Sequence, residues 1–411
     1  MFRTFQLFRN QAFARFFIGN SISLIGWGFN YIAVSWLVLE ITGSKLALGK
    51  MVAVSTLPGL VIALYAGTIV DRMNRKHLLV LLDIYRGILT LAVPMLFLLG
   101  HFSLWQLYAL SFLSGIAFGI FWPCASAFVQ ELVPEKDYLS ANALLSASYQ
   151  SGALLGSALG GFVVSWWGAQ FALALDGVTY LISALLIGSA VYRPAAHLMK
   201  TEPVWQTFIY GLRFMARRRM IMFYGLVSVL SDVAIWGALA VLTIALSLDI
   251  LQAGPEGFGL MEGAYGVGAL LATFYAIWAT GLFRRRNFLL AAYAVAGATC
   301  FFLPLMPGLT WAMLLFLIMG LHNNSARIVS RTIMMELIPN EVMGRAQTIL
   351  SVSTRLLVIA STLAAGLVAE RTSVGFSLQV TSGLFWLSLI GVLVTARLRP
   401  HFFDRPQSVN F

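Results

Sequence analysis

The segment ELVPEKDYLSANALLSAS at residues 131–148 returns later in the chain as ELIPNEVMGRAQTILSVS at residues 336–353. The second copy follows the first by 205 residues, and the same offset pairs Gly115 with Gly320 and Gly161 with Gly366. A match at an offset of about half the chain length predicts two copies of one structural unit that share the same orientation.

The composition indicates that lipid surrounds both copies. Of the 411 residues, 59% are apolar and only 10% are charged, and the mean hydropathy is +0.84. Soluble domains carry roughly a quarter charged residues. Because the bilayer core tolerates only helices or closed barrels, the excess of apolar residues predicts many membrane-spanning helices.

Apolar runs of about 20 residues, the length that crosses the hydrocarbon as a helix, recur twelve times along the chain. The first run follows three arginines but is too long for a signal peptide, so we expect it to stay in the mature protein. The predicted spans lie near residues 16–39, 51–70, 78–99, 104–130, 140–166, 171–192, 220–248, 258–282, 288–306, 309–335, 346–369 and 374–396.

The basic residues predict the orientation of these spans. Most of the 27 lysines and arginines fall in cytoplasmic segments if both termini are cytoplasmic, as expected for a multi-pass protein of a bacterial inner membrane. The net charge of +11 is then a consequence of topology, and nucleic-acid binding is not expected.

The expected fold class is an all-α membrane protein in which twelve helices form two pseudo-symmetric six-helix bundles. Residues 1–192 would form the first bundle and residues 220–411 the second. Between them, residues 193–219 have apolar residues spaced for one face of a helix and basic residues nearby, which predicts an amphipathic helix on the cytoplasmic surface. Parallel six-span repeats are typical of transporters whose bundles move around a central site.

The loop between the second and third spans reads GTIVDRMNRK at residues 67–76. Gly67 allows close helix approach, and Asp71 can face a cation or a helix N-terminus, or it can be a solvated loop charge. Three basic residues favour a cytoplasmic position for this loop, namely Arg72, Arg75 and Lys76.

Together with the repeat and the spans, this loop resembles the signature loop of the major facilitator superfamily, G-x-x-x-D-R-x-G-R-K, with Asn74 in place of the second glycine. The resemblance covers the whole chain. It implies the fold of that superfamily, in which the loop acts in conformational switching and the carboxylate at Asp71 latches it against the eleventh span.

The fifth span contains GALLGSALGG, whose spacing alone favours generic close packing of helices. The segment resembles the antiporter motif of exporters in the superfamily, with Ser157 where that motif has proline. Four further segments, LVLEITGS, VDRMNRKHLL, ELVPEKDYLSANAL and MGRAQ, resemble the drug:proton antiporter branch that contains macrolide efflux pumps and enterobactin exporters. The glycines of the motif are Gly152, Gly156, Gly160 and Gly161.

Ionisable residues deep in the predicted spans are candidate functional groups, because inserting them into lipid is expensive. We expect Asp232 to carry protons, with His322 and Arg355 as candidate partners; a static Asp–Arg pair that fixes packing is an equal alternative. Asp83 and Arg86, three residues apart in the third span, are expected to form a structural ion pair.

The remaining candidates would line a central cavity. The resemblance implies that spans one, four, seven and ten face it, and an aromatic wall with few polar groups suits flat or amphipathic ligands. The cavity candidates are Asn20, Trp27, Asn30, Tyr31, Phe121, Trp122, Asn323, Asn324 and Arg327.

These patterns predict a secondary active exporter of small amphipathic molecules, either a siderophore or a drug such as a macrolide. The expected energy source is a proton gradient, with no cofactor and no metal. A lysophospholipid-type flippase of the same superfamily is the alternative. Lipid and the small-molecule substrate would be its partners, and a monomer is the form that the resemblance implies. The chain has no H-E-x-x-H and no P-loop motif, so an enzyme is not expected.

Overall fold

The computed structural model describes residues 7–134, 137–192, 212–338 and 340–404. Most of the predicted amphipathic helix at 193–219 lies outside the described residues; within it, residues 212–217 are helical. The burial of Gly67 and the side chain of Asp71 also lie outside the description, although the backbone of both residues is helical.

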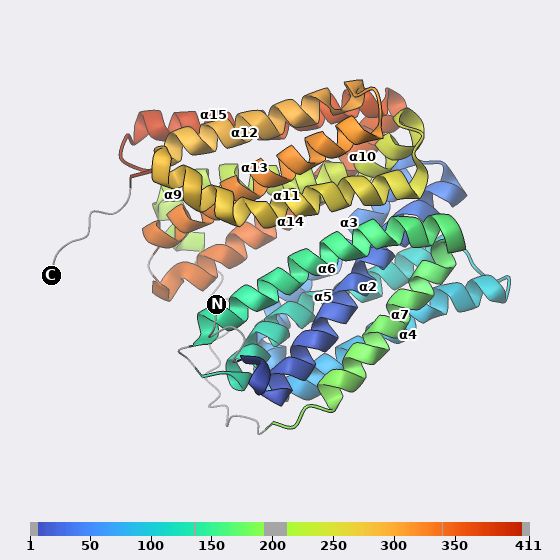
Figure 1. Cartoon of the computed structure of the whole chain (residues 1–411). Helices are drawn as coiled ribbons and strands as arrows, with labels where there is room; N and C mark the ends of the chain where they lie inside the picture. The colour runs from blue at the N-terminus through green and yellow to red at the C-terminus, as the bar shows by residue number, and fades with distance from the viewer. Residues whose placement is uncertain (1–6, 135–136, 193–211, 339, 405–411) are drawn as a thin grey trace. The chain divides into compact units, whose positions relative to one another are not determined.

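Long α-helices make up the first half of the chain (Figure 1). A short turn of helix, η1 (Leu7–Arg9), precedes them. They are α2 (Gln11–Thr42), α3 (Lys45–Arg72), α4 (Arg75–Leu98), α5 (Leu104–Leu132), α6 (Tyr138–Trp167) and α7 (Ala169–Gly188).

The second half begins with one continuous rod in which two π-helical segments interrupt the α-helix. The rod consists of α9 (Arg219–Val233), η3 (Ala234–Leu239), α10 (Ala240–Ala245) and η4 (Leu246–Ile250). The helices that follow are α11 (Gly254–Leu282), α12 (Arg285–Phe302) with η5 (Leu303–Leu305), α13 (Leu309–Leu337), α14 (Asn340–Arg371) and α15 (Val374–Leu398).

Eleven of the helical segments in the described part of the chain are long and apolar enough to cross a membrane. The fifth predicted span corresponds to α6, which has 30 residues but is not one of the eleven. The helices extend beyond the predicted apolar runs at several ends, because capping residues rather than hydropathy determine where a helix begins. The prediction of an all-α membrane protein is confirmed.

The chain divides into two compact units. The first contains residues 1–202 together with 253–263 at the start of α11, and the second contains residues 203–252 and 264–411. Within the first unit, α2 packs against α6 and α7, α4 against α7, and α3 against α5. Within the second, α12 packs against α13 and α15, and α15 packs against α9.

The repeat is visible in the packing of corresponding glycines. A Cβ atom on Gly115 would meet the carbonyl of Ser55 on α3, and a Cβ atom on Gly320 would meet the carbonyl of Tyr265 on α11. The offset is therefore 205 residues for α5 and 210 residues for α3, with a different loop length between them. Each glycine allows two helix backbones to touch inside its own unit.

Candidate functional site

An aromatic group lies between α2, α5 and α6 of the first unit. Trp27 stacks on Tyr31 and Phe118, with ring centroids 6.1 and 6.2 Å apart. Tyr149 lies 6.0 Å from the Trp27 ring and 5.2 Å from the Trp122 ring. All five side chains are partly exposed, so the structure brings Trp27, Tyr31 and Trp122 together as one accessible aromatic surface.

Three other cavity candidates are packed within the first unit. Asn20 is completely buried and donates a hydrogen bond to the Ser148 hydroxyl at 3.2 Å. Asn30 donates to a carboxylate oxygen of Asp176 on α7 at 2.9 Å. The ring of Phe121 is buried beneath a guanidinium group of α4. These side chains connect helices of the same unit.

Asp232 of the second unit is the penultimate residue of α9, two residues before the start of the π-helical segment η3. Single π-helical turns within α-helices are frequent at functional sites. Its carboxylate lies 3.9 Å from the guanidinium of Arg327 on α13, and the two side chains are 22% and 35% exposed. Both side chains are thus partly exposed, and their separation is too long for a hydrogen bond.

Arg327 connects this pair to a chain of polar groups. It donates to Asn324 Oδ1 at 2.6 Å, and the side-chain amides of Asn324 and Asn323 each donate to the Tyr265 hydroxyl at 3.1 Å. Three of the predicted cavity residues therefore belong to one hydrogen-bonded network that ends at Asp232. The sequence did not single out Tyr265; its position opposite Gly320 in the repeat is the signal that could have found it.

The other two residues of the proton-coupling hypothesis lie apart from Asp232. His322 faces α11, where its Nε2 atom is 3.4 Å from the Tyr275 hydroxyl, and its Nδ1 atom is 2.9 Å from the Ile318 carbonyl. Arg355 lies on α14, and within the described residues no ion pair joins it to Asp232. Arg327 is the cation that the structure places beside Asp232.

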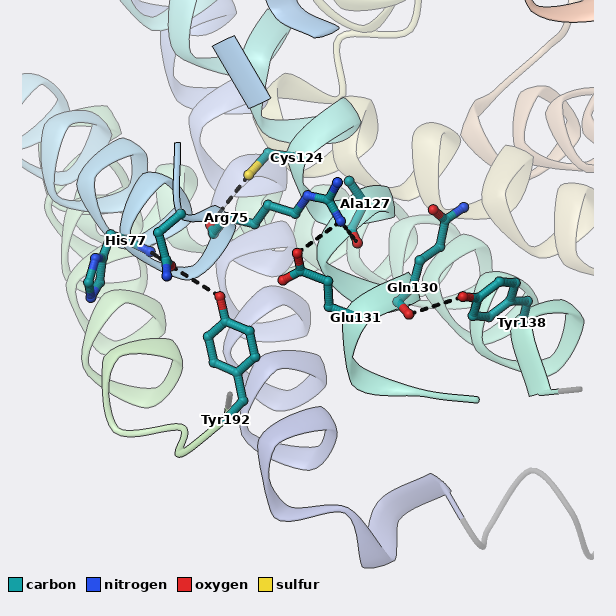
Figure 2. Close-up of polar contacts among 9 residues, drawn as sticks. Arg75, His77, Cys124, Ala127, Gln130, Glu131, Tyr138 and Tyr192 are labelled. Carbon is teal, nitrogen blue, oxygen red and sulfur yellow. Dashed lines mark hydrogen bonds and ion pairs between the residues drawn. The ribbon is translucent and has the colours of Figure 1, made fainter. Parts of the chain in front are cut away.

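The loop between α3 and α4 forms a second polar site, in the first unit (Figure 2). Arg75, the first residue of α4, makes a 3.0 Å ion pair with Glu131 near the end of α5 and donates to the Ala127 carbonyl at 3.0 Å. The Cys124 thiol lies 3.4 Å from the Arg75 carbonyl. Arg75 therefore fastens the start of α4 to the last turns of α5.

The departure from the signature loop at Asn74 has a physical reason in this geometry. Asn74 is the N-cap of α4 with extended backbone angles, its side-chain oxygen accepting from the His77 amide and from the Tyr192 hydroxyl, each at 3.1 Å. A glycine could not cap the helix through a side chain. The Lys76 ammonium donates to the Ala190 carbonyl at 2.7 Å, while Arg72 is exposed.

The second unit repeats the ion pair. Arg285 is the first residue of α12, as Arg75 is of α4, and Glu336 precedes the last residue of α13, as Glu131 does in α5. The guanidinium of Arg285 reaches both oxygens of Glu336, at 2.5 and 2.9 Å. We did not single out Glu131 and Glu336 from the sequence, although both head the repeated segment.

The glycine motif of α6 lies against α2. Cβ atoms on Gly152, Gly156 and Gly160 would come within 2.3–3.2 Å of the nearest α2 atoms, and Gly28 of α2 would meet Gly156 in turn. Gly161 faces the first turn of α11 within the same unit. Helix α6 continues through Ser157 without interruption, so the position where the exporter motif has proline is regular α-helix here.

A family model described as "Transmembrane secretion effector" matches residues 3–407. The chain is 24% identical over 330 residues to the multidrug efflux pump Tap of Mycolicibacterium fortuitum, covering 78% of this chain and 80% of that one. It is 23% identical over 346 residues to a putative bacilysin exporter, BacE, of Bacillus amyloliquefaciens, covering 82% and 83%.

Solved structures share the fold. The nucleoside transporter NupG matches with a TM-score of 0.74 at 11% identity, covering 93% of this chain and 98% of that one. A D-xylose–proton symporter matches with a TM-score of 0.70 at 16% identity, covering 96% and 99%. At these identities, the likeness to both structures concerns the fold alone.

Proposed function

The chain belongs to the transmembrane secretion effectors of the major facilitator superfamily, and we propose that it is a proton-coupled exporter of small amphipathic molecules. The observation that carries this proposal is the accessible Asp232–Arg327 pair of the second unit, with the amide network behind it. A carboxyl group that both a proton and a cationic partner can occupy is the element that proton antiport requires.

The exchange would follow from competition at Asp232. An ionised Asp232 attracts Arg327, whereas a protonated Asp232 frees the nitrogen that faces it to bind a polar group of the cargo, while the hydrogen bond from Arg327 to Asn324 is retained. Binding of a proton and binding of cargo would then favour different states of the Asp232–Arg327 pair. This competition would couple proton flux to cargo flux when the transporter opens alternately to the two sides of the membrane.

The aromatic surface of the first unit would supply most of the contact area for cargo. Trp27, Tyr31 and Trp122, with Phe118 and Tyr149, offer flat apolar faces with few fixed polar groups. Such a surface accepts a range of ring-containing or amphipathic molecules rather than one compound. A catecholate siderophore and a macrolide are the two cargo classes that we propose to test first.

The same proposal specifies the setting of the protein. It would be a monomer in a bacterial inner membrane with both termini in the cytoplasm, powered by the proton gradient without a cofactor. Under this orientation, the Arg75–Glu131 and Arg285–Glu336 pairs lie at the cytoplasmic ends of their units and act in the switch between states.

The test uses purified protein in liposomes with an imposed pH gradient, while lumenal pH is followed after addition of a catecholate siderophore, a macrolide or a lysophospholipid. We expect proton flux with one of the first two ligands, and a return to the rate of empty liposomes in Asp232→Asn. The exposed Asp404, which pairs with His401, provides the matched control Asp404→Asn, which should transport normally.

Two further variants separate the candidate cations. Arg327→Gln should remove coupling as Asp232→Asn does, and Arg355→Gln should leave more of it. Full proton-driven transport by Asp232→Asn would show that another group carries the proton. Movement of lysophospholipid between leaflets without any proton flux would replace the exporter proposal by the flippase alternative.

A further inference from the structure

A buried group of charges lies inside the first unit, in addition to the polar sites described above. Asp83 and Arg86 of α4 form a hydrogen-bonded ion pair, and the Ser183 hydroxyl of α7 donates to the second Asp83 oxygen at 2.7 Å. The Arg86 guanidinium lies 4.1 Å from the Phe121 ring centroid and 4.4 Å from that of Tyr180. The ion pair expected from the sequence is thus shielded on several sides by α5 and α7.

A second carboxyl group, that of Asp176 on α7, belongs to the same region and is completely buried. Its Oδ2 atom accepts the hydrogen bond from Asn30 of α2. Its Oδ1 atom has no hydrogen-bond partner among the described residues and faces Gly26, where a Cβ atom would lie 2.6 Å away. No ion pair reaches Asp176 within the described part of the chain, so this carboxyl lacks the cation that Asp83 has.

The charges of this group do not balance unless a proton is present. Arginine stays protonated in proteins, so two ionised carboxylates would leave one uncompensated negative charge inside a helical bundle. Burying an unpaired charge is unfavourable, and a carboxyl in that position binds a proton instead. Asp83 receives the Arg86 and Ser183 donors, whereas Asp176 receives one neutral amide, so the proton belongs on Asp176.

The second unit shows that the packing does not require these charges. Helices α4 and α12 both start at an arginine, which aligns them at the 210-residue offset of α3 and α11. Helices α7 and α15 align at 205 residues, from Ala169 to Val374. The positions equivalent to Asp83, Arg86 and Asp176 are all buried and uncharged, namely Tyr293, Ala296 and Thr381.

We propose that Asp83, Arg86 and Asp176 form a proton-binding site of the first unit, which holds one proton on Asp176 Oδ1. The Thr179 hydroxyl, which faces Gly26 beside that oxygen and donates to the Asp176 carbonyl at 2.7 Å, can accept the carboxyl hydrogen through its free lone pair. The titratable or charged groups facing Asp176 are Asp83 and Arg86 from α4 and Tyr180 from α7.

The site has a direct connection to the aromatic surface. Asn30, which holds Asp176 Oδ2, lies on α2 between Trp27 and Tyr31. Gain or loss of the proton would change the charge on the carboxyl group to which the Asn30 amide donates, and therefore the strength of the hydrogen bond that holds the helix carrying these two rings. The proposal concerns a different unit from Asp232 and does not depend on the proposed export activity.

Infrared spectroscopy of the purified full-length protein at neutral pH tests this charge balance, because protonated carboxylic acids absorb separately from carboxylates. Asp176→Asn should lose the band of one protonated carboxyl. Asp83→Asn should also lose one, because the remaining Asp176 then ionises opposite Arg86. Arg86→Gln should gain one, because neither carboxyl then has a cation.

Two further variants keep the test decisive if Arg86→Gln does not fold. The uncharged pair Asp83→Asn with Arg86→Gln should retain the native band intensity, and adding Asp176→Asn should remove one band. Asp404→Asn should match the native protein. Unchanged intensity in Asp176→Asn would overturn the proposal, as would loss of the native band in sodium but not in potassium buffer, which would make a metal cation the ligand. None of these outcomes requires transport, so failure of the export proposal is separately detectable.

Discussion

In the first unit Glu131 is 4% exposed and its partner Arg75 also donates to Ala127, whereas in the second unit Glu336 is 26% exposed and reaches Arg285 through both oxygens. The repeat puts both pairs at the same helix ends. Their surroundings differ, and the free energy of an ion pair depends on those surroundings more than on its geometry. Equivalent positions in the two copies therefore need not contribute equally to stability or to switching.

The interiors of the two units differ in the same way. Where α4 buries Asp83 and Arg86, α12 buries a tyrosine and an alanine, and the Tyr293 hydroxyl lies 3.3 Å from the Ser330 hydroxyl. One copy of the repeat thus carries charged side chains at positions where the other copy has uncharged residues, one of which makes a neutral hydrogen bond. Because neutral residues are sufficient for packing at these positions in one copy, the charged residues at the equivalent positions in the other copy require a functional explanation.

The largest expected difference between the copies concerns the glutamates of the two ion pairs. Glu131→Gln removes the buried carboxylate that pairs with Arg75 at 3.0 Å, which should cost about 3 kcal/mol of the first unit's stability. Glu336→Gln removes a more exposed partner and should cost about 1 kcal/mol in the second unit.

The two buried cysteines allow each unit to be followed separately. Cys124 lies in the first unit and Cys300 in the second, so a thiol-reactive dye reports one unit when the other cysteine is replaced by alanine. Glu131→Gln should lower the unfolding midpoint reported by Cys124, and Glu336→Gln should lower that reported by Cys300 by less. Equal shifts would show that burial does not distinguish the pairs.

An effect of similar size in both units is expected at the repeated glycines. Gly115→Ala and Gly320→Ala each place a methyl group against a backbone carbonyl that cannot move without separating two helices. Each should cost about 1–3 kcal/mol, the typical cost of overpacking. The same thiol assay should show the loss in the first unit for Gly115 and in the second for Gly320.

The matched control is Gly383→Ala on α15, where nothing lies within 4 Å of the added methyl group. Alanine favours a helix over glycine by about 1 kcal/mol, so this variant should be neutral or slightly stabilised. A large effect at Gly115 together with none at Gly320 would mean that the two contacts are not equivalent, and the alignment of the repeat at these helices would need revision.

Much of the fold could be predicted because it depends on patterns that are visible in a single amino-acid sequence. Apolar runs of the length of the bilayer identified the spans, and the repeated segment at Glu131 and Glu336 predicted two related units. The N-cap at Asn74 was also readable in principle, since asparagine before a helical run is a common start signal.

The candidate sites could be predicted only in part, because the hydropathy pattern of a membrane protein does not determine how each helix is rotated about its own axis. Both faces of such a helix are apolar, and Asp83 and Asp176 are 93 residues apart on different helices. Spacing therefore could not place Asp176 beside Asp83, although the two residues share one buried region. For the same reason we named Arg355 as a candidate partner of Asp232, whereas the structure places Arg327 there. The π-helical segment after Asp232 has no signal in composition.

The smallest expected effect concerns the neutral counterpart of the buried charges. Tyr293→Phe removes one hydroxyl, while Tyr224 keeps its 2.9 Å hydrogen bond to Ser330, so no buried polar group of this trio is left without a partner. The cost should be about 1 kcal/mol, that of a single neutral hydrogen bond, and the Cys300 signal should report it while the Cys124 signal stays unchanged. Tyr65→Phe, at an exposed tyrosine of α3, is the control and should shift neither signal. A loss at Tyr293 as large as that at Glu131 would contradict the comparison, because the neutral copy would then depend on its polar group as strongly as the charged copy does on its ion pair.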